Sequence, residues 1–462
     1  MAIDIQTIFQ ENEAARFALS ADHLNKHLVR HLTAMGYNTA FQSGRGAYLY
    51  DKGGTEYLDL LAGWGVFSVG RNHPAIRDAL KSALDCNLPN LVQLDFSTLA
   101  GVLAKKLLSY TPYLQRVFFA NSGAETVEAA IKMARAATGR TGVVFCSRAF
   151  HGLTYGALSL NGSDVYKNGF GPLLSGFTEI PFNDLVALEQ ALRTQDVAAF
   201  VVEPIQGSGV YVPSDDYFAS VAALCRKYGT LFVVDEVQTG LGRTGRFLAI
   251  EHWGVEPDMV LLAKALSGGY VPIGALLTRE WVFDKVFERT GRAAAHGSTF
   301  SKNDLAMAAG IATLDVIETE RLTERAARLG ELLMKSLETI AQKHEVIHEV
   351  RGKGLMIAVE FGAPRSLRLQ AAWSVLEKTK KGLFSLLVAI PLLREHRILA
   401  QAGDRFIKLT PPLVVSEADC QRIVQAFDSV LTDSEQLPSA MWSFGLSLAG
   451  NFKRGRDLIA SS

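Results

Sequence analysis

The chain has 462 residues, of which 48% are hydrophobic and 20% are charged, so it can bury large cores in more than one domain. Forty-seven basic residues balance forty-seven acidic ones, which excludes a global field that would attract nucleic acid or an anionic membrane. Scattered cysteines without metal-ligand spacing, acidic residues near the N-terminus in place of a secretory signal, and apolar runs too short to span a bilayer predict a cytoplasmic protein.

The first 75 or so residues are predicted to form an N-terminal segment. They contain a helical start and then two short strand-like pieces, residues 46–50 and 56–60. The polar turn between these pieces contains Gly53 and Gly54, which favour a reversal of the chain. We expect residues 1–75 to pack with the smaller C-terminal domain.

Residues 76–315 alternate between helical and strand-like patterns and are predicted to form a large domain. The expected strands are residues 116–120, 142–146, 198–205, 230–237 and 258–263. Alternation at this spacing is typical of βαβ units, and it predicts an α/β fold with a mostly parallel sheet.

Residues 316–432 are predicted to form a smaller α+β domain. A charged, periodic helix is expected from Glu318 to about Lys343, and strands are expected at residues 354–361 and 405–409. Residues 433–462 are expected to form an amphipathic appendage that could touch a membrane surface. Its apolar residues are Met441, Trp442, Phe444, Leu446 and Leu448, and its basic residues are Lys453, Arg454 and Arg456.

Two apolar runs of the large domain each end in a charged residue, Asp235 and Lys264. Residues 231–234 show no alternation and are rich in β-formers, which is typical of a parallel strand covered on both faces. Ligands bind at the carboxyl ends of such strands. A lysine and a carboxylate placed there suit pyridoxal phosphate, which needs an amine for its aldehyde and a carboxylate that keeps its ring nitrogen protonated. The alternative is a solvated lysine and a helix-capping aspartate.

A phosphate site is predicted where the strand at residues 116–120 turns into a helix. Ser122, Gly123 and Ala124 lie at this turn, where free backbone N–H groups and the helix dipole can bind an anion. A turn of small residues is more often only a turn. Thr299 and the serine before it offer a second pair of hydroxyls, for which an ordinary helix cap is the alternative.

Seven motifs link these positions along the chain: FFANSGAETVEAAIKMAR, FHGLTYGALS, VVEPIQGSG, LFVVDEVQTGLGRTGR, DMVLLAKALSGGYVPIGA, HGSTFSKNDLA and KLTPPLVV. In order and spacing they closely resemble the class III (omega) aminotransferase family of fold-type I pyridoxal phosphate enzymes. The resemblance runs from about residue 30 to residue 432. It implies a mostly parallel central sheet, a smaller α+β C-terminal domain, and a homodimer with two shared sites.

The resemblance implies the chemical roles of three residues. Lys264 would bond the cofactor aldehyde and carry a proton, Asp235 would hold the ring nitrogen, and Gln238 would hydrogen-bond the ring hydroxyl. The implied reaction is a ping-pong transamination, in which an amino acid and a carbonyl compound use the cofactor in turn.

The resemblance also implies supporting contacts. The Ser122–Ala124 turn would hold the cofactor phosphate, and Thr299 would reach the phosphate of the neighbouring subunit. Phe150 would stack on the cofactor ring, although a core phenylalanine is the alternative. Glu203 would be a buried glutamate behind the cofactor.

Two residues depart from the family pattern. Many members that alternate between an omega-amine and a 2-oxo acid carry an arginine before the double proline and a glutamate two residues after EPIQ, where this chain has Lys408 and Ser208. Lysine lacks the bidentate fork that suits a carboxylate, and serine cannot neutralise a cation. The alternative is that Lys408 still binds a carboxylate as a point charge.

Three residues are therefore candidate substrate contacts: Trp64, Arg243 and Lys408. Arg351 and Arg405 could bind a carboxylate in place of Lys408.

Residues 382–404 form an apolar insert where the resemblance leads us to expect a shorter connection. It is either a core or dimer-interface helix or, with Lys408, Ser208 and the tail, a feature similar to the aminotransferases of hopanoid lipid biosynthesis. We therefore expect transamination between an amino acid and the carbonyl of a sizeable, partly apolar substrate. The alternatives are an ornithine, acetylornithine or 4-aminobutyrate type of enzyme, an aminomutase on the same fold, or a non-catalytic cofactor-binding protein.

Overall fold

The computed structural model describes residues 3–379 and 381–436. Its large domain is built on a seven-stranded sheet with the strand order β4-β10-β9-β8-β7-β5-β6. Only β10 runs antiparallel to its neighbours, so the predicted mostly parallel α/β sheet is confirmed. The strands are β4 (Arg116–Ala120), β5 (Gly142–Cys146), β6 (Phe177–Ile180), β7 (Val197–Val202), β8 (Leu231–Asp235), β9 (Met259–Leu262) and β10 (Gly274–Thr278).

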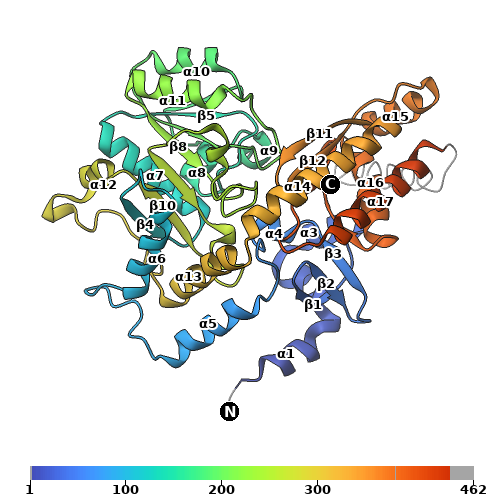
Figure 1. Cartoon of the computed structure of the whole chain (residues 1–462), viewed down its shortest axis with the longest axis horizontal. Helices are drawn as coiled ribbons and strands as arrows, with labels where there is room; N and C mark the ends of the chain where they lie inside the picture. Colours follow the sequence, from blue (N-terminus) through green and yellow to red (C-terminus); the bar gives the residue numbers. More distant parts are fainter. Residues whose placement is uncertain (1–2, 380, 437–462) are drawn as a thin grey trace.

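Helices cover both faces of this sheet (Figure 1). Val233 and Leu261 pack in one apolar cluster with side chains of α7 (Gly123–Thr138) and α12 (Glu280–Phe287). Val234 and Val260 belong to the opposite cluster, which includes α6 (Thr98–Ser109), α11 (Tyr217–Tyr228) and α13 (Asp304–Thr319). Because both faces are covered, every residue of β7, β8 and β9 is buried, and these strands show no polar alternation.

The small domain begins after a break between two helices. Arg321 adopts a left-handed φ of 51°, so α13 ends before it and α14 (Leu322–Lys343) begins after it. The predicted helix start at Glu318 is therefore wrong. An antiparallel sheet of order β11-β12-β15-β14 follows. Its strands are β11 (Ile347–Lys353), β12 (Met356–Phe361), β14 (Gln401–Ala402) and β15 (Phe406–Leu409).

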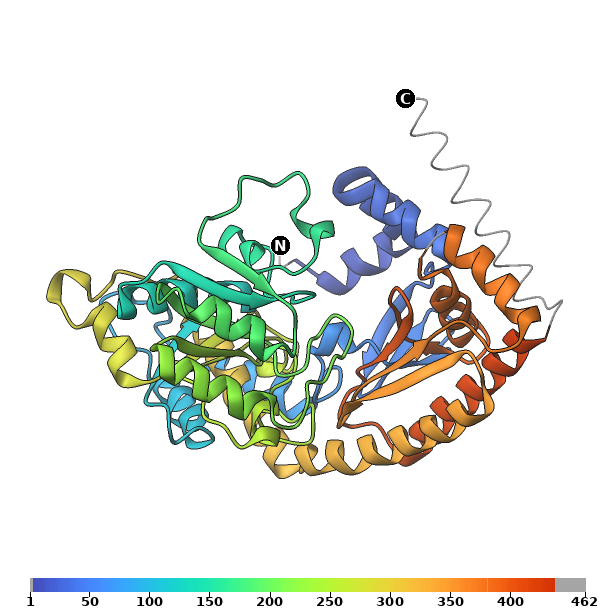
Figure 2. The ribbon, with the colours of Figure 1, turned by 90° about the horizontal axis from the view of Figure 1, so that it is seen from above.

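A third sheet joins the N-terminal segment to the small domain. Strands β1 (Phe41–Arg45), β2 (Tyr48–Asp51) and β3 (Glu56–Asp59) pair antiparallel, and β13 (Ile398–Leu399) pairs in parallel with β3. Figure 2 shows this N-terminal part, in blue, beside the orange and red C-terminal part. The remaining helices are α1 (Ile5–Asn12), α2 (Arg16–Ser20), α3 (Lys26–Met35), α4 (Ala62–Gly65), α5 (Pro74–Asp85), α8 (Tyr155–Ser159), α9 (Asp164–Lys167), α10 (Leu185–Leu192), α15 (Leu367–Thr379) and α17 (Glu417–Glu435).

The apolar insert forms a core helix, α16 (Leu383–Arg394). Ten of its twelve residues are buried, and it packs against α15, α17 and β13 of its own chain. The core-helix interpretation of the insert is thus confirmed. The predicted appendage lies outside the described residues from position 437 onward. Among the helices within residues 3–379 and 381–436, none is both long enough and apolar enough to cross a membrane.

Candidate active site

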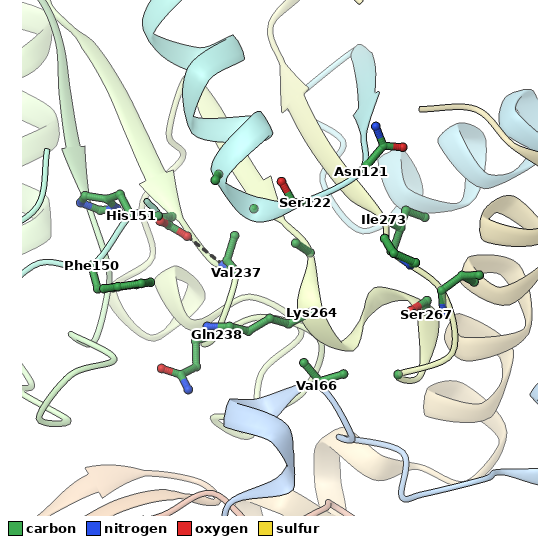
Figure 3. A pocket seen from close by; sticks show the side chains of 18 of the residues that line it. Val66, Asn121, Ser122, Phe150, His151, Val237, Gln238, Lys264, Ser267 and Ile273 are labelled. Atoms are coloured by element: carbon green, nitrogen blue, oxygen red, sulfur yellow. Dashed lines mark hydrogen bonds and ion pairs between the residues drawn. The ribbon is translucent and has the colours of Figure 1, made fainter. Parts of the chain in front are cut away.

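A cavity of about 410 Å³ opens where the carboxyl ends of β8 and β9 meet the N-terminus of α7 (Figure 3). It is lined by residues 121–124, 150–152, 237–238, 263–264 and 269–273, together with Val66, Glu203, Asp235 and Ser267. The structure therefore brings together every residue predicted to bind the cofactor except Thr299.

Asp235 forms a buried pair with His151. The Asp235 side chain accepts a hydrogen bond from Val237 N at 3.0 Å, and its Oδ2 lies 2.7 Å from His151 Nδ1. Burial alone would lower the pKa of His151, but the hydrogen bond and the charge of Asp235 outweigh burial and raise it. The two side chains therefore form a buried hydrogen-bonded pair on the cavity lining. Sequence reasoning missed His151, although it directly follows Phe150 in the FHG motif.

Glu203 holds the loop that carries Phe150 and His151. Its two carboxylate oxygens accept hydrogen bonds from Phe150 N at 3.1 Å and from Gly207 N at 2.9 Å. Burial raises the pKa of Glu203. Since both oxygens are used by backbone donors, the side chain fixes the position of the loop.

Lys264 extends into the cavity towards Gln238 (Figure 3). It follows β9 and adopts a left-handed φ of 41°, a strained conformation for a residue with a side chain. Burial lowers the pKa of Lys264, although the charges of Asp235 and Glu203 oppose this effect. Burial thus favours the neutral amine, which is the form that attacks a carbonyl or accepts a proton.

The N-terminus of α7 forms an anion cradle at the opposite end of the cavity from Gln238. Ser122 is the N-cap, and its Oγ accepts a hydrogen bond from Glu125 N at 3.1 Å. The first-turn N–H groups of a helix have no intrahelical acceptor and can bind a phosphate. Gly123 is packed closely, because a Cβ at this position would lie 3.0 Å from Val237. These residues fit a cofactor that carries both an aldehyde and a phosphate.

Thr299 does not line the cavity, and its side chain is exposed. Its neighbour Ser298 accepts a hydrogen bond from Asn121 Nδ2 at 2.7 Å, which places this segment beside the anion cradle. Within one chain, therefore, Thr299 is not brought together with the other predicted cofactor contacts.

Gln238 connects Lys408 and Trp64. Gln238 Nε2 donates to Trp64 O at 2.9 Å, while Lys408 Nζ lies 3.4 Å from Gln238 Oε1 and donates to Gly207 O at 2.7 Å. Lys408 is only 3% exposed and is not among the lining residues. Trp64 is exposed and does not line the cavity, although its carbonyl is bound to the lining residue Gln238.

The predicted arginines are engaged elsewhere. Arg243 is fully buried, and its guanidinium donates to Leu355 O, Pro411 O and Ser68 Oγ. Burial lowers the pKa of Arg243 to about 9. The structure therefore gives Arg243 a packing role in place of the predicted substrate contact.

Arg351 and Arg405 are paired with acidic side chains. Arg351 binds Glu349, Glu360 and the carbonyl of Gly209. Arg405 Nε donates to Glu377 Oε2 at 3.1 Å. Neither residue lines the cavity.

The fold and the cavity place this chain among the pyridoxal phosphate-dependent transferases of fold type I, because a buried amine, a carboxylate held by a histidine and an anion cradle converge on one side of the sheet. Within that class the chain belongs to the class III aminotransferases, since residues 33–431 match the aminotransferase class-III family. The chain is thus an aminotransferase that depends on pyridoxal phosphate.

Relatives within the family carry several different names. The chain is 35% identical to the aminotransferase PigE of Serratia sp., a match that covers 92% of this chain but only 54% of PigE. It is 39% identical to a putrescine aminotransferase of Pectobacterium atrosepticum, over 83% of this chain and 80% of that protein. It is 38% identical to an acetylornithine aminotransferase of Bacillus cereus, over 85% and 94% of the two chains.

Among solved structures, the chain is similar to the ornithine aminotransferase of Toxoplasma gondii. The TM-score is 0.80 at 32% identity, and the match covers 94% of this chain and 100% of that chain. That structure has partial occupancy of pyridoxal phosphate at its active site.

Proposed function

We propose that this enzyme transfers an amino group between an amino acid and the carbonyl of a sizeable, partly apolar substrate. A lipid-like aldehyde such as a hopanoid derivative would be one member of this substrate class. The observation that carries the proposal is the pairing of the candidate cations: within the described residues, Lys408, Arg243, Arg351 and Arg405 each donate at least one hydrogen bond to a protein acceptor, and none of them lines the cavity.

The proposed roles of the cavity residues follow from their chemistry. Lys264 would hold the cofactor aldehyde, Asp235 the ring nitrogen, and the Ser122–Ala124 turn the phosphate. Phe150 would cover the ring, and Gln238 would hydrogen-bond the ring hydroxyl. When bound, pyridoxal phosphate supplies an aldehyde and a ring that accepts electrons from the substrate carbon.

The protein's own part in the reaction is to place and move protons. Neutral Lys264 can take the proton from the amine-bearing carbon of the substrate at Nζ and return it to the reacting group. Asp235, whose Oδ2 is paired with His151, would stabilise a proton on the ring nitrogen of the bound cofactor. Glu203 keeps the Phe150–His151 loop in place throughout.

Two exposed apolar residues that neighbour lining residues along the chain are candidate contacts for such a substrate. Trp64 is 59% exposed, and Leu153 is 56% exposed directly after Gly152 of the lining. Ser208, where a glutamate would be expected, donates its hydroxyl hydrogen to Arg148 O at 2.8 Å. The insert contributes nothing to this argument, because α16 is a core helix away from the cavity lining.

A half-reaction screen of the holoenzyme tests the proposal. Amines of matched length with and without a carboxylate, such as 4-aminobutyrate against butylamine and then hexylamine and decylamine, are added one at a time. The measured quantity is the rate at which the cofactor absorbance band is converted. We expect kcat/KM to rise with chain length by about fourfold for each buried methylene group. A strong preference for ornithine or 4-aminobutyrate would overturn the proposal.

A second candidate is an enzyme of the ornithine or acetylornithine type, which the names of several relatives favour. The putrescine aminotransferase relative points the other way, because putrescine has no carboxylate. An aminomutase would return the amino group to the same carbon skeleton. Product analysis separates it from a transaminase, since only transamination needs a second substrate.

A further inference from the structure

Lys408 links three parts of the chain at the edge of the cavity. It lies on β15 of the small domain, and its Nζ donates to Gly207 O at 2.7 Å and makes a longer hydrogen bond of 3.4 Å to Gln238 Oε1. Gln238 follows β8 of the large domain, and its Nε2 donates to Trp64 O in the N-terminal segment at 2.9 Å. The Gln238 amide is therefore held at both its oxygen and its nitrogen.

The backbone at Gly207 packs directly against this amide. A Cβ at position 207 would lie 2.2 Å from Gln238 Oε1 and 3.1 Å from Glu203 Oε1, so only glycine permits the contact. The N–H of Gly207 is used by Glu203 and its carbonyl by Lys408. Lys408 thus stabilises the loop and the amide that rests on it.

The protonation of Lys408 makes it a poor carboxylate receptor. Burial, followed by the charge of Lys264, lowers the pKa of Lys408 to about 7. A neutral amine has two N–H donors, and Gly207 and Gln238 are two acceptors. At pH values above this lowered pKa, the amine is mostly neutral and has neither a charge nor a free donor for a substrate.

We propose that Lys408 is a positioning residue that holds the Gln238 amide in the orientation needed to contact the cofactor, and that Lys408 does not bind a substrate carboxylate. With Gln238 Oε1 bound to Lys408 and one Nε2–H bound to Trp64 O, the second Nε2–H is directed by elimination to the cofactor. The inference rests on the proposed function only through the role of Gln238. It also couples the small domain to cofactor affinity, because β15 supplies the contact.

A double-mutant cycle on cofactor affinity tests this inference. The dissociation constant of pyridoxal phosphate is measured by titrating cofactor-free protein for wild type, Lys408→Met, Gln238→Ala and the double variant. Loss of one hydrogen bond should weaken binding about threefold to tenfold in each single variant. If Lys408 acts through Gln238, the double variant should match Gln238→Ala alone.

Two further variants complete the design. Arg405→Met removes a cation just before β15 that is paired with Glu377, and it should leave cofactor affinity unchanged. If Lys408→Met does not fold, Lys408→Gln replaces it, since its shorter side chain cannot reach both acceptors.

Two results would overturn the inference. One is that the losses of cofactor affinity in the two single variants multiply in the double variant. The other is unchanged cofactor affinity together with a KM increase confined to carboxylated substrates. Cofactor titration needs no substrate. If the enzyme does not react with apolar amines, the proposed substrate class is wrong, but the test of Lys408 still gives a result.

Discussion

Asp235 and Lys264 meet because they end two adjacent parallel strands, β8 and β9, at the same edge of the sheet. Both side chains are buried: Asp235 is paired with His151, and burial lowers the pKa of Lys264. A carboxylate and an amine whose neutral form is favoured thus have different tasks in one cavity.

Lys264→Ala should abolish turnover, because the covalent anchor and the proton carrier are both lost. Cofactor should still bind through the anion cradle and Asp235, with a lower affinity. The measurement is single-turnover conversion of donor amine, followed by absorbance. Lys335→Ala, which removes an exposed lysine of α14 outside the cavity lining, is the matched control and should react at the wild-type rate. Near wild-type turnover in Lys264→Ala would show that another residue is the anchor.

Asp235→Asn should slow proton abstraction by orders of magnitude while weakening cofactor binding much less. Asparagine keeps a hydrogen bond, but it lacks the charge that stabilises a proton on the cofactor ring. The variant also leaves the imidazolium of His151 uncompensated, so the pKa of His151 should fall. The rate of the half-reaction and the His151 resonance in NMR spectra report the two effects. Full activity in Asp235→Asn would mean that another group holds the ring nitrogen.

At the scale of elements, sequence reasoning predicted five of the seven strands of the large sheet. Strands β4 and β5 have the predicted boundaries, β8 and β9 lie within the predicted ranges, and β7 begins one residue before its predicted range and ends three residues before its end. Sequence reasoning missed β6, an edge strand with two exposed residues, because it lacks an apolar run. It also missed β10, since its antiparallel pairing with β4 and β9 depends on contacts distant in sequence.

For the site residues, features set by the local sequence could be predicted, and contacts with distant segments of the chain could not. Motif order predicted which residues the cavity gathers, with the exception of Thr299, because strand ends and a helix N-terminus are local features. The partners of Lys408 and Arg243 could not be predicted, since Gly207, Leu355 and Pro411 come from other segments of the chain.

The burial of α16 leads to a prediction about stability. Leu387 is fully buried in this helix, so Leu387→Ala should lower the free energy of unfolding by about 2–5 kcal/mol. The relative kcat/KM values for short and long amines should stay the same, because α16 does not line the cavity. Denaturant unfolding and the amine series measure the two quantities. A selective loss of activity on long-chain amines would show that α16 contributes to the substrate site.

At the scale of the whole molecule, one face around Thr299 suits a second copy of the chain. Leu94 is 99% exposed and Phe96 is 91% exposed, and Phe300 beside Thr299 is 60% exposed. The loop that carries Leu94 and Phe96 is tied to the same segment, because Ser97 Oγ donates to Asp304 Oδ1 at 3.0 Å. Exposed apolar side chains of this kind mark interaction surfaces. We therefore propose a homodimer in which Thr299 reaches the phosphate site of the partner.

Subunit mixing tests whether the sites are shared. Thr299→Glu should repel the cofactor phosphate, and Lys264→Ala is inactive by itself. If Thr299 acts on the partner's site, a heterodimer of these two variants contains one intact site, so random mixing should restore about a quarter of wild-type sites. Mixing Lys264→Ala with Asp235→Asn is the control, because both residues belong to the same cavity and no intact site can form. Recovery in the control mixture, or none in the test mixture when mass spectrometry confirms heterodimers, would contradict the shared-site dimer.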